Sequence, residues 1–213
     1  MTELFCSAVT SPTEQLIVPL RTGPAGVVPP ITGVRSTLLA SSLMALKERD
    51  LLPRYLENLP PSLHSKVLHS VAGSWLPVDI GVAHYTAADR LELSAHEQFE
   101  IGRSVAERVQ NGMLGTLVRL AKTAGVTPWT GLQQFQRLWD RLLQGGSGAV
   151  YRLGPKEARV EIHGVSLVSI AYFRNGWRGM FAGSGQLFAS KVYVTEISRQ
   201  TTRTSMALRV AWA

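Results

Sequence analysis

The last forty residues of the chain carry its clearest alternation of hydrophobic and polar positions. Apolar and small side chains recur every three or four residues from 173 to 188, which predicts a helix with one apolar face. The period then shortens to two residues from 191 to 195, and does so again from 206 to 212 after a polar turn. The predicted order is therefore helix, strand, turn, strand.

Helical spacing also predicts five helices in the part of the chain before residue 145. Their predicted starts lie near Ser36, Ser62, Val78, Ser94 and Thr127. Ser94 and Glu97 have the spacing of a capping box, in which each side chain accepts a hydrogen bond from the other residue's backbone N–H. The helix that this box opens is expected to be the longest, reaching about Thr123.

Three glycines interrupt the apolar seam of this longest helix. Gly102, Gly112 and Gly115 each cost the helix about 1 kcal/mol relative to alanine. Such a cost indicates that a neighbouring backbone or a ligand comes close at these positions. Helix packing is the explanation that we prefer.

Taken in order, these elements predict an α+β fold. Residues 149–153 and 158–163 alternate with period two around a turn and form a first predicted hairpin. We expect an N-terminal helical layer packed on a C-terminal four-stranded antiparallel sheet, with a helix before the last hairpin. Residues 33–213 would form this single domain. Residues 1–32, rich in proline and glycine, are expected to be a flexible tail, with a short strand at 15–20 as the alternative.

Composition narrows the class of protein. No apolar run approaches the roughly 18 residues that a membrane-spanning helix needs, so we expect a soluble protein. The single cysteine, Cys6, excludes an internal disulfide framework and favours a reducing, cytoplasmic location. The net charge of +7 is compatible with nucleic-acid binding, but no run of five basic residues occurs and several arginines have acidic neighbours. A nucleic-acid partner is therefore not expected.

Catalytic and metal-binding motifs are missing from the sequence. Neither a nucleophile elbow nor a phosphate-binding glycine loop occurs, and Cys6 lies in the predicted tail. His64 and His69 are five residues apart, which places them about 140° apart around a helix. We expect no catalytic residue, no metal site and no cofactor.

A ligand pocket is the functional feature that the sequence favours. Pockets for small ligands combine aromatic and apolar walls with a few polar groups. Seven large amphipathic residues near predicted helix ends are our candidates for such a pocket, the alternative being that the tryptophans are core and the arginines extend to solvent. They are Trp75, His84, Tyr85, Arg103, Arg174, Trp177 and Arg178.

The chain also resembles a known superfamily. The segment FRNGWRGMFAGSGQLFASKVYV followed by SMALRVAW is similar to the C-terminus of the superfamily that joins haem nitric-oxide sensors, vinyl-four-reductase domains and Golgi transport-particle subunits. Within it, VRSTLL, WLPVD, GRSVAERV and VYRLGPKEARVEI resemble an uncharacterised paralogous family of myxobacterial proteins. The resemblance implies helices against a four-stranded antiparallel sheet, with a pocket between them for haem, a small molecule or an acyl chain.

The functional residues of that superfamily do not carry over to this chain. Its haem branch has a Tyr-x-Ser-x-Arg signature, whereas Tyr151, Tyr172 and Tyr193 are each followed by a different pattern. The acylated cysteine of the transport-particle branch has no counterpart, because Cys6 lies outside the similar region. The resemblance therefore implies a haem-free pocket.

We accordingly expect a non-enzymatic sensing or protein-interaction domain in cytoplasmic signalling. Its ligand would be a small apolar molecule or an acyl chain, and it would bind a protein partner or form a homo-oligomer through a strand edge or helix face. One alternative is a structural subunit of an assembly. Another is an enzyme that uses Arg174, Arg178 and His84 on an anionic substrate, which a tight cluster of these side chains would favour.

Overall fold

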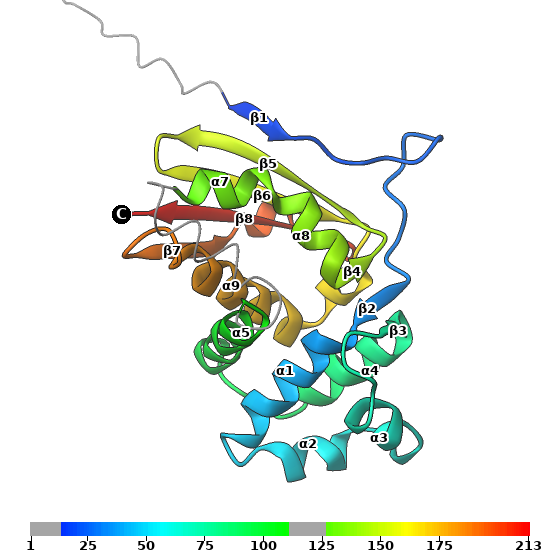
Figure 1. Cartoon of the computed structure of the whole chain (residues 1–213). Coiled ribbons are helices and arrows are strands. Elements are labelled where there is room, and N and C mark those ends of the chain that lie inside the picture. Colours follow the sequence, from blue (N-terminus) through cyan, green and yellow to red (C-terminus); the bar gives the residue numbers. More distant parts are fainter. Residues whose placement is uncertain (1–13, 111–126) are drawn as a thin grey trace, which may run out of the picture.

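Helices make up most of the described residues before residue 143, and the long strands of the main sheet follow, except for the N-terminal strand (Figure 1). The structure is a computed structural model that describes residues 14–110 and 127–213. Its α-helices are α1 (Ser36–Lys47), α2 (Leu52–Asn58), α3 (Pro61–Leu68), α4 (Val78–Asp89), α5 (Ala95–Val109), α7 (Pro128–Gln133), α8 (Phe135–Leu142) and α9 (Ala171–Gly185). Within these ranges no helix is both long and apolar enough to cross a membrane.

The main sheet is antiparallel and has the strand order β1-β5-β6-β8-β7. Its strands are β1 (Gln15–Val18), β5 (Ser147–Gly154), β6 (Glu157–His163), β7 (Val192–Glu196) and β8 (Ser205–Trp212). The two predicted hairpins, β5–β6 and β7–β8, join through β6 and β8. The expected α+β class, with helices packed on an antiparallel sheet and α9 before the last hairpin, is confirmed.

The sheet has five strands and not the expected four, because β1 pairs with the outer edge of β5. The residues after β1 are also held in place. The backbone N–H of Ile31 donates to the carbonyl of Gly164, and that of Gly146 donates to the carbonyl of Pro29, each at 2.8 Å. The alternative of a short strand within residues 15–20 is therefore the one that the structure shows, as β1. The flexibility expected of residues 1–32 stays a prediction, and residues 1–13 lie outside the described residues.

A second, small sheet has the order β3-β2-β4 and links distant parts of the chain. Its strands are β2 (Gly33–Arg35), β3 (Trp75–Pro77) and β4 (Leu143–Gln144). Because β4 directly follows α8, this sheet ties α8 to the N-terminal helices. Two short 3-10 helices, η2 (Ser166–Ser169) and η3 (Ser198–Gln200), complete the described elements.

One face of the main sheet is covered by helices. Along β6, Ala158, Val160 and Ile162 are buried, while the intervening Arg159 and Glu161 are only partly covered and form an ion pair of 2.8 Å on the opposite face. This alternation is the one that the sequence predicted. Helices α8 and α9 contact the strands, and α5 and α1 lie beyond α9 (Figure 1).

The predicted capping box and one of the predicted close approaches are both present. The Ser94 hydroxyl accepts from the N–H of Glu97 at 3.2 Å, and the Ser94 N–H donates to the Glu97 carboxylate at 2.8 Å. A Cβ on Gly102 would lie 1.9 Å from the carbonyl oxygen of Gly176 in α9, so a neighbouring backbone requires this glycine. Gly112, Gly115 and the predicted end of the helix near Thr123 lie outside the described residues.

A candidate ligand-binding cavity

A cavity of about 360 Å³ lies among helices α5, α7, α8 and α9 and strands β7 and β8. Its size falls within the range of about 300 to 1,000 Å³ that is usual for small-molecule sites. The wall is predominantly hydrophobic. The aromatic residues in it are Phe135, Trp139, Trp177, Phe181, Phe188 and Trp212.

Helical periodicity explains why α8 and α9 turn these rings toward a common space. Phe135, Trp139 and Leu142 are spaced by four and three residues along α8, so they share one face of that helix. Trp177 and Phe181 have the same relationship on α9. The two helix faces are in contact through their aromatic rings. Phe135 stacks on Phe181 with ring centroids 5.6 Å apart, and Trp139 packs on Trp177 with centroids 5.4 Å apart.

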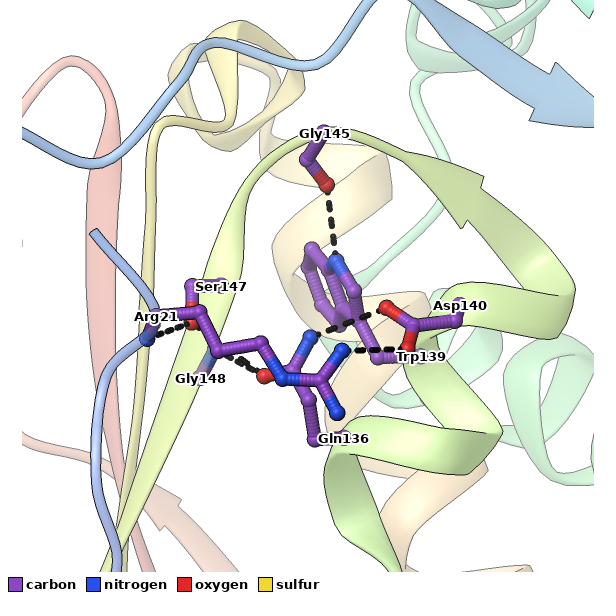
Figure 2. A network of polar contacts seen from close by, with 7 residues as sticks. All are labelled: Arg21, Gln136, Trp139, Asp140, Gly145, Ser147 and Gly148. Carbon is purple, nitrogen blue, oxygen red and sulfur yellow. Dashed lines mark hydrogen bonds and ion pairs between the residues drawn. The ribbon is translucent and has the colours of Figure 1, made fainter. Parts of the chain in front are cut away.

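The face of α8 that does not line the cavity is fixed to β5 by a buried glutamine (Figure 2). The side-chain oxygen of Gln136 accepts from the hydroxyl of Ser147 and from the backbone N–H of Gly148, each at 3.2 Å. Its amide nitrogen donates to Asp140 at 3.0 Å. A single side chain thereby satisfies polar groups on both elements, which removes the cost of leaving them unpaired in the interior.

The same network reaches the segment that follows β1 (Figure 2). The Arg21 guanidinium pairs with the Asp140 carboxylate at 2.6 Å, and the Arg21 backbone N–H donates to the Ser147 hydroxyl at 2.7 Å. On the other side of α8, the Trp139 indole N–H donates to the carbonyl of Gly145 at 2.9 Å. Asp140, which holds Arg21, therefore directly follows Trp139, which lines the cavity.

The cavity has few polar groups in its wall. The Gln110 amide donates to the Ser184 hydroxyl at 3.1 Å, so these two polar side chains are hydrogen-bonded to each other. Arg141 is the one charged residue among the described residues that line the cavity, and its side chain is exposed. None of the ion pairs within residues 14–110 and 127–213 includes Arg141.

A second, much smaller cavity of about 20 Å³ shares Trp177 and Met180 with the large one. This volume holds about one water molecule. Ser42, Tyr85 and Tyr172 also line it. Polar groups therefore lie directly behind the aromatic wall of the large cavity.

Those polar groups belong to a buried hydrogen-bonded chain centred on His84. The Tyr55 hydroxyl lies 2.8 Å from His84 Nδ1, and the Ser42 hydroxyl lies 3.0 Å from His84 Nε2 and 3.3 Å from the Tyr172 hydroxyl. Burial disfavours the charged imidazolium and lowers the pKa of His84 to about 3. Burial also raises the pKa of Tyr172 to about 12. The hydrogen-bonded side chains of His84 and Tyr172 are thus uncharged at physiological pH.

Three of the seven residues proposed from the sequence lie in or beside the cavities. Trp177 lines both cavities, Tyr85 lines the small one, and His84 lies behind it through Ser42. Trp75 lies elsewhere, in the small sheet, where the Arg35 guanidinium stacks 3.7 Å above its ring. A role of Trp177, Tyr85, His84 and Trp75 in ligand binding stays a prediction.

The three proposed arginines do not line either cavity. Arg103 pairs with Glu100 on its own helix at 2.6 Å. Arg174 donates to the carbonyl of Val168 at 2.8 Å, and Arg178 donates to the side-chain oxygen of Asn175 at 3.0 Å. The hydrogen-bond partners of His84 are Tyr55 and Ser42, so the structure does not form the Arg174, Arg178 and His84 cluster that an enzyme of anionic substrates would need.

Most of the cavity wall was not singled out from the sequence as a site. The helical spacing that begins near Thr127 predicts an apolar stripe, but such a stripe has the same pattern whether it meets another helix or an empty space. The one available signal was the density of large rings in two segments, which carry Phe135 and Trp139 in one and Trp177, Phe181 and Phe188 in the other. Across the described ranges, histidine, cysteine and acidic side chains form no group of three that could hold a metal ion.

The fold of this chain is similar to that of several solved structures. The Fe(II) unliganded H-NOX protein from K. algicida matches with a TM-score of 0.61 and 8% identity, over 84% of this chain and 96% of that chain. The chain has the H-NOX fold. An oxygen-binding H-NOX domain related to soluble guanylate cyclases, in its oxygen complex, matches with a TM-score of 0.57 and 12% identity over 83% of this chain and 94% of that chain.

A third structure, from work on haem redox potential and porphyrin distortion, matches with a TM-score of 0.54 and 11% identity over 84% and 99% of the two chains. Identities this low show the H-NOX fold alone. No protein-family model and no curated protein sequence matches the chain. The superfamily resemblance seen in the closing helix and hairpin is confirmed at the level of fold, and its narrower myxobacterial branch stays a prediction.

Proposed function

We propose that this chain is a non-enzymatic, cytoplasmic sensing domain whose cavity holds a small apolar molecule or an acyl chain. The observation that carries the proposal is the cavity of about 360 Å³ with an aromatic and aliphatic wall in an H-NOX fold. Apolar surface of this kind favours ligands that remove it from water. The single cysteine of the chain is consistent with a reducing compartment.

The residues present do not fit haem, whose distortion is the subject of two of the matched structures. Haem iron is held in proteins by histidine, cysteine, tyrosine or methionine. Among the described residues that line the cavity there is no histidine, cysteine or tyrosine, and Met180 is the one sulfur ligand. His84 is hydrogen-bonded at both ring nitrogens. We therefore assign no role to haem.

The connection between the cavity and the N-terminal segment supports a sensing role. Trp139 lines the cavity, and the adjacent Asp140 binds Arg21. A ligand that favours one position of α8 over another would change the stability of the Arg21–Asp140 pair and hence the attachment of β1. Such a ligand shifts the equilibrium by its difference in affinity for the two positions.

The free edge of β7 supports a protein partner or a homo-oligomer. Among the described strands β7 pairs with β8 alone, and the side chain of Tyr193 on β7 is 58% exposed. An edge strand with unpaired backbone groups can accept a strand from another chain. This surface would serve either a signalling partner or the alternative role as a structural subunit.

Native mass spectrometry of the protein purified from its own host tests the proposal. The proposal predicts a bound small molecule or lipid at one per chain, which denaturation and extraction release, and no porphyrin absorption band. A stoichiometric porphyrin would overturn the proposal. A chain that arrives empty, and as a defined assembly, would favour the structural-subunit alternative.

A further inference from the structure

We infer that the ligand of the large cavity carries a carboxylate on its apolar body, and that Arg141 binds this carboxylate. The inference rests on the proposed function and adds the chemical class of the ligand. It would make the ligand a long-chain or aromatic monocarboxylate.

The distribution of charge around the cavity is the basis of this inference. No aspartate or glutamate occurs among the described residues that line the cavity, and Arg141 is the one cation there. Neighbouring basic groups are engaged elsewhere, since Arg137 donates to the side chain of Gln134 at 3.1 Å and Arg21 pairs with Asp140. The rim of the cavity beside Arg141 therefore has an uncompensated positive charge, which attracts anions.

The position of Arg141 fits a head group rather than a buried substituent. It lies in the last turn of α8, one residue before Leu142, and its side chain is exposed while its neighbours in the wall are apolar. A carboxylate placed there keeps part of its hydration, so it does not incur the large cost of burying a charge. The apolar body meanwhile fills the interior.

A guanidinium discriminates among head groups in a defined order. Its paired N–H groups match the two oxygens of a carboxylate, an alcohol offers no charge, and an amine brings a second positive charge. Because Arg141 is exposed, water and salt screen the pair, and the expected preference for an acid over the matching alcohol is modest, about 2- to 5-fold at low ionic strength.

Calorimetric titration with dodecanoic acid, 1-dodecanol and dodecylamine tests the inference on the full chain at neutral pH and low salt. The variants are Arg141→Gln, Arg141→Lys and Arg137→Gln. Arg137 is the matched control, because it is an exposed arginine on the same helix outside the cavity wall. Wild type should bind the acid best and the amine worst.

The expected results separate this inference from the proposed function. Arg141→Gln should bring the affinity for the acid down to that for the alcohol and leave the alcohol unchanged, Arg141→Lys should retain part of the preference, and Arg137→Gln should match wild type. Equal binding of acid and alcohol by wild type, or an unchanged preference in Arg141→Gln, would overturn the inference and leave the proposed function standing. Failure of wild type to bind all three compounds would overturn both.

Discussion

Gly102 on α5 lies directly against Gly176 on α9, and the contact is asymmetric. A Cβ on Gly102 would lie 1.9 Å from the carbonyl oxygen of Gly176, whereas a Cβ on Gly176 would meet no atom within 4 Å outside its own helix. One glycine is therefore required by the neighbouring backbone and the other is not. This crossing joins the N-terminal helices to α9, which forms one wall of the cavity.

Alanine at these two glycines should have opposite effects on stability. Gly102→Ala forces α5 and α9 apart and should lower the free energy of unfolding by about 2 kcal/mol or more. Gly176→Ala removes the flexibility of a mid-helix glycine without a clash, and should be neutral or stabilising by up to about 1 kcal/mol. Urea unfolding of both variants measures the difference, and equal losses in the two would contradict the packing described.

His84 should make stability depend on pH. Its pKa is about 3 in the folded chain and 6.5 when unperturbed, so the unfolded chain binds the extra proton first as the pH falls. The stabilisation is complete above pH 6.5 and is lost progressively below it, by up to about 1.4 kcal/mol per pH unit. Comparison with His84→Gln between about pH 6 and pH 4 isolates this slope, because the other groups are common to both proteins. Parallel curves would show that His84 is not buried neutral.

Gln136, which joins α8 to β5, should contribute more to the free energy of unfolding than an ordinary surface residue does. Gln136→Leu leaves the N–H of Gly148 and the hydroxyl of Ser147 without their buried acceptor, and should cost about 1 to 3 kcal/mol. Gln133→Leu, on an exposed position of the neighbouring α7, is the matched control and should change stability by about 0.5 kcal/mol or less. Thermal unfolding of the pair measures both values. Similar melting temperatures would argue against the network.

Much of the fold could be predicted where a single element shows its own period. The closing helix and hairpin, the capping box at Ser94 and the close approach at Gly102 all depend on residues near in sequence or on one side chain's chemistry. Strand β1 could not be predicted with the same force. Four residues show too little alternation, and the β5 edge that stabilises them lies far along the chain.

The cavity was less predictable than the fold, and for a different reason. Trp177 is a candidate because large amphipathic residues near helix ends often line pockets. Phe135 and Trp139 line the same cavity, but their sequence pattern is that of ordinary core residues. Whether an apolar face meets a neighbour or an empty space depends on how α8 and α9 are separated, and contacts between residues far apart in sequence, such as the stacking of Phe135 on Phe181, determine that separation. The periodicity of a single segment carries no information about the distance between two helices.

The most direct test of the central claim is to fill the cavity and measure the binding of a neutral ligand. Leu142 lines the cavity and is half-buried, and Leu56 on α2 is equally half-buried but lies outside the wall. Calorimetric titration with 1-dodecanol, which is independent of the charge on Arg141, should show at least about tenfold weaker binding by Leu142→Trp, because the added ring displaces ligand contacts worth about 1.4 kcal/mol or more. Leu56→Trp should bind as wild type does. Unchanged binding by Leu142→Trp would place the ligand elsewhere and contradict the account.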